Sequence, residues 1–303
     1  MRLNRVKTKA LPDTTVACSG SNPAGLTFSF DDADNLKTYC DSGGTISYGY
    51  DAANRLTALA EPGGSVTSAS GCNASPCTSF TYDNTDRRTQ ARFPGGATLN
   101  LTYDSAGNQL TAIGNDSSNN ILSSFTYTYN QNTSDRQLRQ TVTEADAVFS
   151  GTTTYGYDAF NRLTSAINTK VGNLSYAYDL NGNRTSDNGG SFSYNAANEL
   201  TASPGVSSWS YDGNGNVSCN SAGVSLSYNA KNQITAMTYG GQTISSLAYA
   251  DLGQTERTQA GGLSFFSSPR GVQIQKSAAQ STFYTRDNKG NLIGERLPGG
   301  ARW

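Results

Sequence analysis

Residues 48–57 read Tyr-Gly-Tyr-Asp-Ala-Ala-Asn-Arg-Leu-Thr, and residues 155–164 repeat them with one change, Tyr-Gly-Tyr-Asp-Ala-Phe-Asn-Arg-Leu-Thr. The same pattern recurs along most of the chain: an aromatic residue, any residue, Tyr, Asp or Asn, two variable residues, Gly or Asn, and then a pair such as Leu-Thr. Recurrence of this kind, with a unit of about twenty residues, is typical of a repeat architecture.

The pattern predicts a β-hairpin. Aromatic residues two positions apart lie on one face of a strand, and the Asp or Asn that follows suits the first position of a type I turn. Three residues later, a Gly or Asn suits the left-handed backbone of a hairpin bulge. These left-handed positions are Asn54, Gly107, Asn161, Gly182, Asn198, Gly215, Asn232 and Gly290. The return strand then carries an aliphatic residue beside the tyrosine, at Leu56, Leu110, Leu163, Leu200 and Ile234.

One hairpin is not stable alone in water, so about twelve of them must stack to bury their Tyr/Leu face. We therefore predict an all-β fold of consecutive antiparallel hairpins that form a curved, spiralling sheet. We expect the second aromatic residue of each repeat and the residue after it to be structural anchors. The anchors are Tyr50, Asp51, Tyr82, Asp83, Tyr103, Asp104, Tyr157, Asp158, Tyr178, Asp179, Tyr194, Tyr211, Asp212 and Tyr228.

The composition argues against catalysis and against nucleic-acid binding. The 303 residues include 22 Lys and Arg, 23 Asp and Glu, and no His, which excludes His-dependent hydrolases and His-ligated zinc. A net charge of −1 gives no basic groove for nucleic acid. The 18 Asp, 28 Asn and 32 Gly residues favour turns, whereas the chain has only 5 Glu. We expect a protein that is not an enzyme and needs no cofactor.

The recurring aspartates have two other interpretations. Paired carboxylates can hydrolyse glycosides, and Asp-x-Asn-Gly-Asn strings such as residues 179–183 and 212–216 offer oxygen ligands to calcium. Repeated carboxylates at one turn position are better explained as turn caps, so we expect no catalytic and no metal site. Tyr and Trp side chains could also stack on sugar rings, which makes carbohydrate binding the alternative function.

Five cysteines leave the redox state open. Cys72 and Cys77 bracket a turn-prone tetrapeptide and could form a disulfide, and Cys18 could pair with Cys40, which leaves Cys219 odd; scattered thiols are the other interpretation. The N-terminus is basic, but no apolar run follows it. We therefore expect no conventional signal peptide, no transmembrane segment and no membrane insertion.

The Tyr-Asp-x-x-Gly-Asn-Arg-Leu-Thr signature resembles the YD repeat of RHS (rearrangement hotspot) proteins, and the resemblance covers residues 26–302. That family includes bacterial polymorphic toxins, insecticidal Tc toxin components, wall-associated proteins and the teneurins. The resemblance implies that the sheet is part of a hollow shell, which in the toxin branch encloses a C-terminal effector released by aspartyl self-cleavage in a core domain.

The chain departs from the family because its sequence holds no Asp-Pro-x-Gly core segment and no effector. We therefore do not expect self-cleavage, and we interpret the chain as a fragment, a truncated product or one piece of an assembly. We divide it into a non-repeat segment, 1–25, and a YD-repeat domain, 26–303. The expected partners are neighbouring YD-repeat segments or copies of the chain, joined through exposed sheet edges, with a polypeptide cargo or surface glycans as further partners. The expected location is secreted or at a bacterial cell surface.

Overall fold

The computed structural model shows an all-β chain. It describes residues 8–10, 25–41, 43–67, 71–130, 138–146, 149–250, 256–268, 271–278, 280–287, 289–297 and 300–302. Every regular element in these residues is a β-strand, and consecutive strands pair as antiparallel hairpins. The predicted fold class is therefore confirmed.

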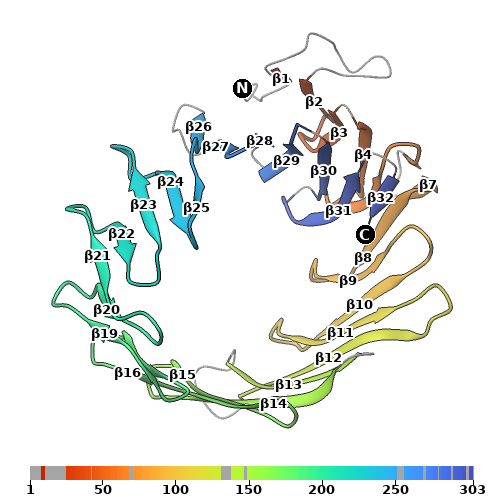
Figure 1. Ribbon diagram of the computed structural model, residues 1–303. Coiled ribbons are helices and arrows are strands. Elements are labelled where there is room, and N and C mark those ends of the chain that lie inside the picture. Colours follow the sequence, from red (N-terminus) through yellow and green to blue (C-terminus); the bar gives the residue numbers. More distant parts are fainter. Residues whose placement is uncertain are drawn as a thin grey trace. The chain divides into compact units, whose positions relative to one another are not determined.

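The largest sheet follows the order of the chain (Figure 1). It comprises β1 (Thr8–Ala10), β2 (Gly25–Phe30), β3 (Leu36–Asp41), β4 (Gly44–Tyr50), β5 (Leu56–Ala60), β8 (Cys77–Tyr82), β9 (Arg88–Arg92), β10 (Thr98–Tyr103), β11 (Gln109–Asn115), β12 (Ile121–Tyr129), β13 (Arg139–Asp146), β14 (Ser150–Tyr157), β15 (Leu163–Asn168), β16 (Gly172–Tyr178), β17 (Arg184–Asp187) and β18 (Gly190–Ser191). Short connections force chain neighbours to become antiparallel sheet neighbours, so a series of hairpins builds a meander.

The other sheets are smaller and also follow chain order. They are formed by β6 (Ser65–Val66) and β7 (Cys72–Ala74); by β19 (Ser193–Tyr194) and β20 (Leu200–Ala202); by β21 (Trp209–Tyr211), β22 (Val217–Asn220), β23 (Ser225–Tyr228), β24 (Ile234–Tyr239) and β25 (Gln242–Ile244); and by β26 (Ala248–Ala250), β27 (Glu256–Ala260), β28 (Leu263–Ser268), β29 (Gly271–Lys276), β30 (Ser281–Arg286), β31 (Leu292–Leu297) and β32 (Gly300–Arg302). The β6–β7 hairpin interrupts the first sheet, because β5 pairs directly with β8.

A disulfide joins Cys72, the first residue of β7, to Cys77, the first residue of β8, so that predicted bridge is confirmed. Cys219 is an exposed free thiol. The predicted Cys18–Cys40 bridge involves Cys18, which lies outside the described residues.

The hairpin turns have the predicted geometry. In the turn after β4, the Asp51 amide donates to the Arg55 carbonyl at 3.1 Å, and the Asn54 amide donates to the Asp51 carbonyl at 3.0 Å. Asn54 adopts φ 60°, and the register shifts between Gly49 and Tyr50, which identifies a bulge. All eight predicted left-handed positions have positive φ, namely Asn54, Gly107, Asn161, Gly182, Asn198, Gly215, Asn232 and Gly290.

The aliphatic residue of the return strand lies opposite the anchor tyrosine. Tyr50 pairs with Leu56, and the same register recurs in the pairs Tyr157–Leu163, Tyr194–Leu200 and Tyr228–Ile234. Directly opposed side chains on one face of a sheet pack against each other. The Tyr/Leu face that the repeat predicted therefore exists.

The chain divides into two compact units. Unit 1 contains residues 1–102, 113–122 and 262–303, and unit 2 contains residues 103–112 and 123–261.

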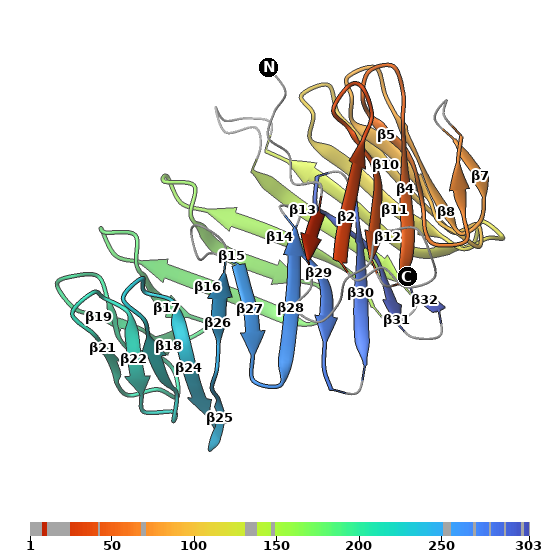
Figure 2. The same ribbon diagram turned by 90° about the horizontal axis from the view of Figure 1, so that it is seen from above.

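Unit 1 has a buried core between strands from the two ends of the chain. Leu36, Tyr39, Ile46, Leu56 and Leu59 have exposed fractions of 2% or less, and they cluster with Ile274 of β29. Half-buried phenylalanines of β28 and β30 pack against the same cluster. Figure 2 shows β28–β31 beside β2–β4. Unit 1 therefore buries its Tyr/Leu face under a second layer of strands.

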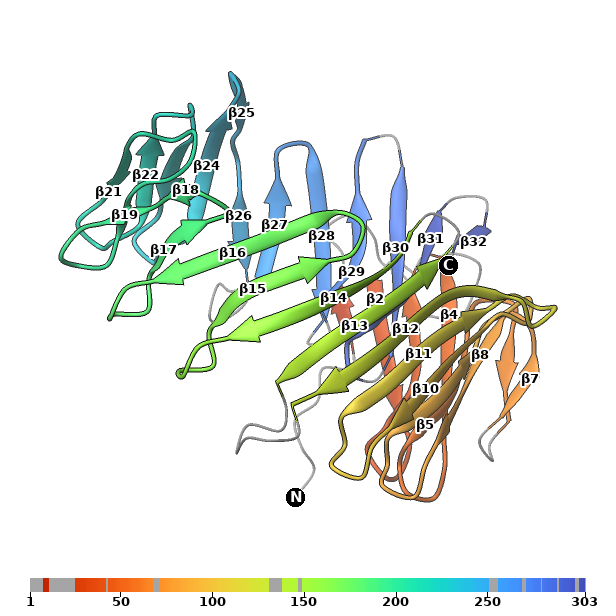
Figure 3. The same ribbon diagram turned by 90° about the horizontal axis from the view of Figure 1, so that it is seen from below.

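Unit 2 has almost no buried core in its described residues. Tyr129 and Ala166 are its buried hydrophobic side chains, with exposed fractions of 9% and 8%. Figure 3 shows β13–β16 as a meander of long strands that lie side by side. Along β14 and β16, every residue is half-buried or exposed. Unit 2 therefore depends on contacts within and between successive hairpins.

Candidate functional site

The aspartate or asparagine of each clear repeat caps its own turn. Asp51 Oδ1 accepts hydrogen bonds from the amides of Ala53, at 3.0 Å, and Arg55, at 2.9 Å. The same bond to the amide four residues on is made by Asp83, Asp104, Asp158, Asp179 and Asp212. The turn amides therefore have an acceptor in every one of these repeats, as the type I turn with a capping residue requires.

The capping side chain also bonds the side chain four positions on, and the two are chemically matched. Where the cap is Asp, the partner is a donor: Asp51 Oδ2 lies 2.7 Å from Arg55 Nε. Where the cap is Asn, the partner is an acceptor: Asn195 Nδ2 donates to Glu199 Oε2 at 2.6 Å, and Asn229 Nδ2 donates to Gln233 Oε1 at 2.7 Å. The recurring carboxylates are thus engaged in local bonds.

The hydrogen bonds to the capping aspartates lower the pKa of these carboxyl groups and so favour their ionised form. Side-chain hydrogen bonds from the Asn four residues on lower the pKa of Asp104, Asp116, Asp179 and Asp212. At Asp51, Asp83 and Asp158, desolvation acts to raise the pKa, but hydrogen bonds from the backbone and from the arginine outweigh it and lower the pKa. The caps therefore act as fixed anions at neutral pH.

The anchor tyrosines link each hairpin to the one before it. Tyr50 donates its hydroxyl hydrogen to the Leu36 carbonyl at 3.0 Å, and Tyr82 donates to the Leu56 carbonyl at 2.6 Å. In both cases the acceptor is the first residue of the preceding return strand. The same link runs from Tyr129 to Gln109, Tyr157 to Arg139, Tyr178 to Leu163, Tyr194 to Arg184, Tyr211 to Leu200, Tyr228 to Val217 and Tyr249 to Ile234. We call this series the tyrosine ladder.

The tyrosine ladder was missed by sequence reasoning, which treated the anchors only as packing residues. The first aromatic position of the repeat accepts Phe, Leu or Trp, whereas the second is almost always Tyr. A requirement for the hydroxyl was therefore visible in the pattern. Tyr103 closes β10 at the equivalent place. The anchors do not converge on one place but lie along successive hairpins.

A second set of bonds joins neighbouring turns along the turn edge. Arg55 Nη1 donates to Asp86 Oδ1 of the next turn at 2.9 Å, and Arg162 Nη1 donates to the Asp179 carbonyl at 2.9 Å. Left-handed asparagines supply the acceptor in other repeats, in the pairs Asn35–Asn54, Asn183–Asn198 and Asn216–Asn232. Each repeat is thus connected to its neighbour at the tyrosine and at the turn.

Unit 1 contains one further cluster, which we call the arginine seam. Arg296 of β31 places Nη2 2.7 Å from Asp41 Oδ2 and Nε 3.1 Å from Glu61 Oε2. The exposed fractions are 0% for Asp41, 1% for Glu61 and 5% for Arg296. Burial raises the pKa of Glu61, against the lowering effects of Thr285 and Arg296. The seam fastens β31 to the strands near the N-terminus.

The seam residues do not form a metal site or a membrane element. Among the described residues, no three His, Cys, Asp or Glu side chains are grouped so that they could hold a metal ion. Within the same residues, no helix is long and apolar enough to span a membrane. Among all the described residues, the large aromatic side chains that are exposed are Phe160, at 77%, and Tyr239, at 63%, both in unit 2.

The fold and the turn chemistry define a β-scaffold of YD repeats, and comparison with known families agrees. Residues 30–66 match the RHS Repeat family, and residues 116–264 match the Teneurin YD-shell family. The chain therefore belongs to the RHS/YD-repeat family. No curated protein matches the sequence.

Two solved structures share the fold. The crystal structure of TcdB2-TccC3 has a TM-score of 0.66 and 12% identity over 91% of this chain, which spans 16% of that chain. The Photorhabdus luminescens Tc holotoxin pore has a TM-score of 0.52 and 13% identity over 91% of this chain, which spans 18% of that chain. The present sequence thus corresponds in length to less than a fifth of these relatives.

Proposed function

We propose that this chain is non-enzymatic wall material of a YD-repeat shell, which encloses a polypeptide cargo. The observation that carries the proposal is that the recurring polar residues spend their side chains on hydrogen bonds within the wall. Capping aspartates and anchor tyrosines, such as Asp51 and Tyr82, are engaged in bonds within and between repeats. Residues used in this way stabilise a continuous wall and are not free to perform chemistry.

We further propose that residues 26–303 act as one repeat domain on the outside of a bacterial cell or in a secreted particle. Its partners would be neighbouring YD-repeat segments or further copies of the chain, joined at strand edges. Unpaired edge strands present rows of backbone donors and acceptors, which are templates for pairing with another strand. The similarity to shell regions of Tc toxin complexes supports this assignment.

The carbohydrate-binding alternative receives less support. Sugar stacking needs an exposed aromatic face. The anchor tyrosines of unit 2 are half-buried or, at Tyr129, buried, and the hydroxyls of Tyr157, Tyr178 and Tyr211 are bonded to backbone carbonyls. A glycan array probed with the full chain separates the two functions, because wall material is expected to bind no glycan.

The enclosing function is tested by protease protection. An unstructured reporter peptide is fused after Trp303 of the full chain, and its cleavage by trypsin is compared with that of the same reporter fused to an unrelated β-sheet protein. We expect cleavage to slow about tenfold or more, because an enclosed chain is cut only when the wall opens. Equal cleavage rates would overturn the enclosing function.

A further inference from the structure

The sequence contains three Asn-Gly pairs, at residues 181–182, 188–189 and 214–215, and each lies in a hairpin turn of unit 2. An asparagine side chain is chemically labile before a glycine, because the glycine nitrogen can attack the side-chain carbonyl carbon and no Cβ on the glycine hinders ring closure. The three pairs therefore place the same reacting groups in three different surroundings.

In the first pair, both reacting groups are bonded. The Gly182 amide donates to the Asp179 carbonyl at 3.2 Å. The side chain of Asn181 also has a partner, because its Nδ2 donates to Asn198 Oδ1 of the next repeat at 3.1 Å. The capped turn of this repeat thus occupies the nitrogen that would attack and holds the amide group that would leave.

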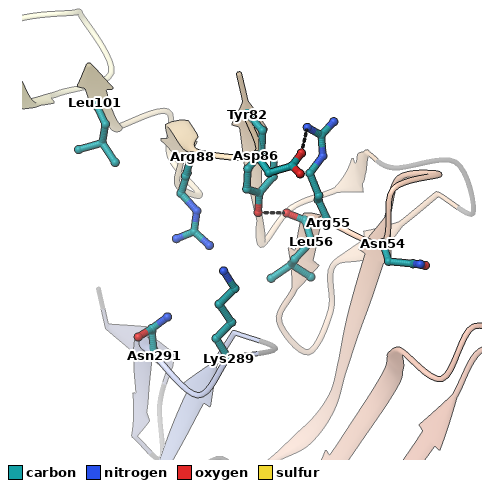
Figure 4. Close-up of a pocket in the computed structure, with 9 residues that line it drawn as sticks. All are labelled: Asn54, Arg55, Leu56, Tyr82, Asp86, Arg88, Leu101, Lys289 and Asn291. Atoms are coloured by element: carbon teal, nitrogen blue, oxygen red, sulfur yellow. Dashed lines mark hydrogen bonds and ion pairs between the residues drawn. The ribbon is translucent and has the colours of Figure 1, made fainter. Parts of the chain in front are cut away.

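The Asn214-Gly215 pair repeats this arrangement, with the Asp212 carbonyl accepting at 3.1 Å and Asn232 Oδ1 accepting at 3.0 Å. Contacts between neighbouring turns also occur in unit 1, where Figure 4 shows the Arg55 side chain bonded to Asp86 of the next turn. In the two capped Asn-Gly pairs, the reaction therefore requires hydrogen bonds of the turn to break first.

The third pair lies in a turn of a different kind. Asn188 and Gly189 join β17 to β18 with φ of 47° and 87°, and Asp187 pairs with Gly190, so this is a two-residue loop of type I′. Asn188 is exposed, and among the described residues neither its side chain nor the Gly189 amide has a hydrogen-bond partner. Apart from chain neighbours, no atom lies within 4 Å of the position that a Cβ on Gly189 would take. Both reacting groups are therefore unbonded and open to water.

We propose that Asn188 is a site of spontaneous covalent modification, by deamidation through a cyclic imide. The Gly189 nitrogen forms a bond to Asn188 Cγ, the Cγ–Nδ2 bond breaks, and ammonia leaves with the proton of the Gly189 amide. Water then opens the imide at one of its two carbonyl carbons, which yields aspartate or isoaspartate at position 188. No oxidant or reductant takes part. The proposal is independent of the shell function, because it depends only on this turn.

Isoaspartate at this position is expected to disrupt the hairpin. Its main chain runs through the former side chain, which adds one carbon to a loop whose length determines the register of β17 and β18. Gly190 has no room to shift toward Pro204, since a Cβ on Gly190 would lie 2.5 Å from Pro204 Cγ. β18 is the last strand of the largest sheet and pairs with β17 at only two positions. The modification is therefore expected to separate β18 from this sheet.

The test is peptide mapping by mass spectrometry, applied to the full chain during incubation at mildly alkaline pH and constant temperature. We expect deamidation at Asn188 to be about tenfold faster or more than at Asn181 and Asn214, because only the latter two must first lose hydrogen bonds. Equal rates at the three pairs, or the slowest reaction at Asn188, would refute the proposal.

Asn198→Gly provides a matched variant. It removes the acceptor of Asn181 Nδ2 and places at position 198 the residue that best tolerates the left-handed φ of 62° found there. We expect deamidation at Asn181 to become about three- to tenfold faster, and deamidation at Asn188 to keep its rate. An unchanged rate at Asn181 would show that the bonds of the turn do not control the reaction.

Hydrogen exchange measures the effect on the hairpin. Amides of residues 185–191 are expected to exchange faster in the isoaspartate fraction, separated by chromatography, than in the fresh chain. Asn188→Asp is the control, because it adds the negative charge beside Asp187 without the extra main-chain carbon, and we expect it to exchange as the fresh chain does. Unchanged exchange in the isoaspartate fraction would contradict the separation of β18.

Discussion

Units 1 and 2 are built from the same hairpin, yet they bury it to very different degrees. Residues 48–57 and 155–164 differ at one position, and their turns have the same caps and the same left-handed asparagine. Leu56 is 1% exposed in unit 1, whereas Leu163 at the equivalent place in unit 2 is only half-buried. The repeat therefore determines the hairpin, and a second layer of strands determines whether a hydrophobic core forms.

The largest effect is expected at the arginine seam. Arg296→Met leaves Asp41 and Glu61 buried without a counter-charge, which is expected to lower the free energy of unfolding by about 3–5 kcal/mol. The measurement is urea-induced unfolding of the full chain. The control is Arg162→Met in unit 2, where the Asp158 pair is partly exposed and its loss is expected to cost about 1 kcal/mol or less. Equal losses in the two variants would contradict a buried seam.

The matched leucines test the comparison directly. Leu56→Ala removes a buried side chain and is expected to cost about 2–5 kcal/mol of unfolding free energy, because it opens a cavity in the core. Leu163→Ala removes the same side chain from a half-buried position and is expected to cost about 1 kcal/mol. Both are measured by denaturant unfolding. A Leu163→Ala loss as large as that of Leu56→Ala would show that unit 2 has a core of its own.

The tyrosine ladder is expected to matter equally in the two units. Tyr82→Phe and Tyr178→Phe each leave a backbone carbonyl without its donor, which is expected to cost about 0.5–1.5 kcal/mol of unfolding free energy. Tyr239 is exposed and serves as the control, since Tyr239→Phe is expected to change nothing. If either ladder variant matches this control by thermal or urea unfolding, the ladder is not a stabilising link.

The smallest effect concerns pH. The lowered pKa of the capping aspartates means that the unfolded chain binds their protons more readily than the folded chain does. Their contribution is therefore complete above the unfolded pKa of about 4 and is lost as the pH falls below it. Asp212→Asn is expected to flatten slightly the loss of stability between about pH 4 and pH 2. If Asp212→Asn lost stability with falling pH as steeply as the parent chain does, this would contradict a capping carboxylate at this turn.

Glu61 acts in the opposite sense. Its raised pKa means that the folded chain binds this proton more readily, so its contribution is complete below the unfolded pKa and is lost as the pH rises through the folded pKa. The seam of unit 1 and the turn caps of both units therefore respond to acid in opposite directions.

The hairpins could be predicted from the sequence because their determinants are local. A capping residue, its partner four positions on and a left-handed Asn or Gly all lie within one turn, as residues 51–55 show. The tyrosine ladder was less visible, since each of its bonds joins neighbouring repeats. The seam could not be predicted, because Asp41 and Arg296 are 255 positions apart and neither stands in a recurring pattern.

Hydrogen exchange tests the central claim most directly, because it compares two near-identical sequences within one molecule. Amides of β4 and β5 are expected to exchange about a hundredfold or more slowly than the equivalent amides of β14 and β15, since only the former lie under a second layer of strands. Equal exchange in residues 44–60 and 150–168, or slower exchange in the latter, would contradict the account.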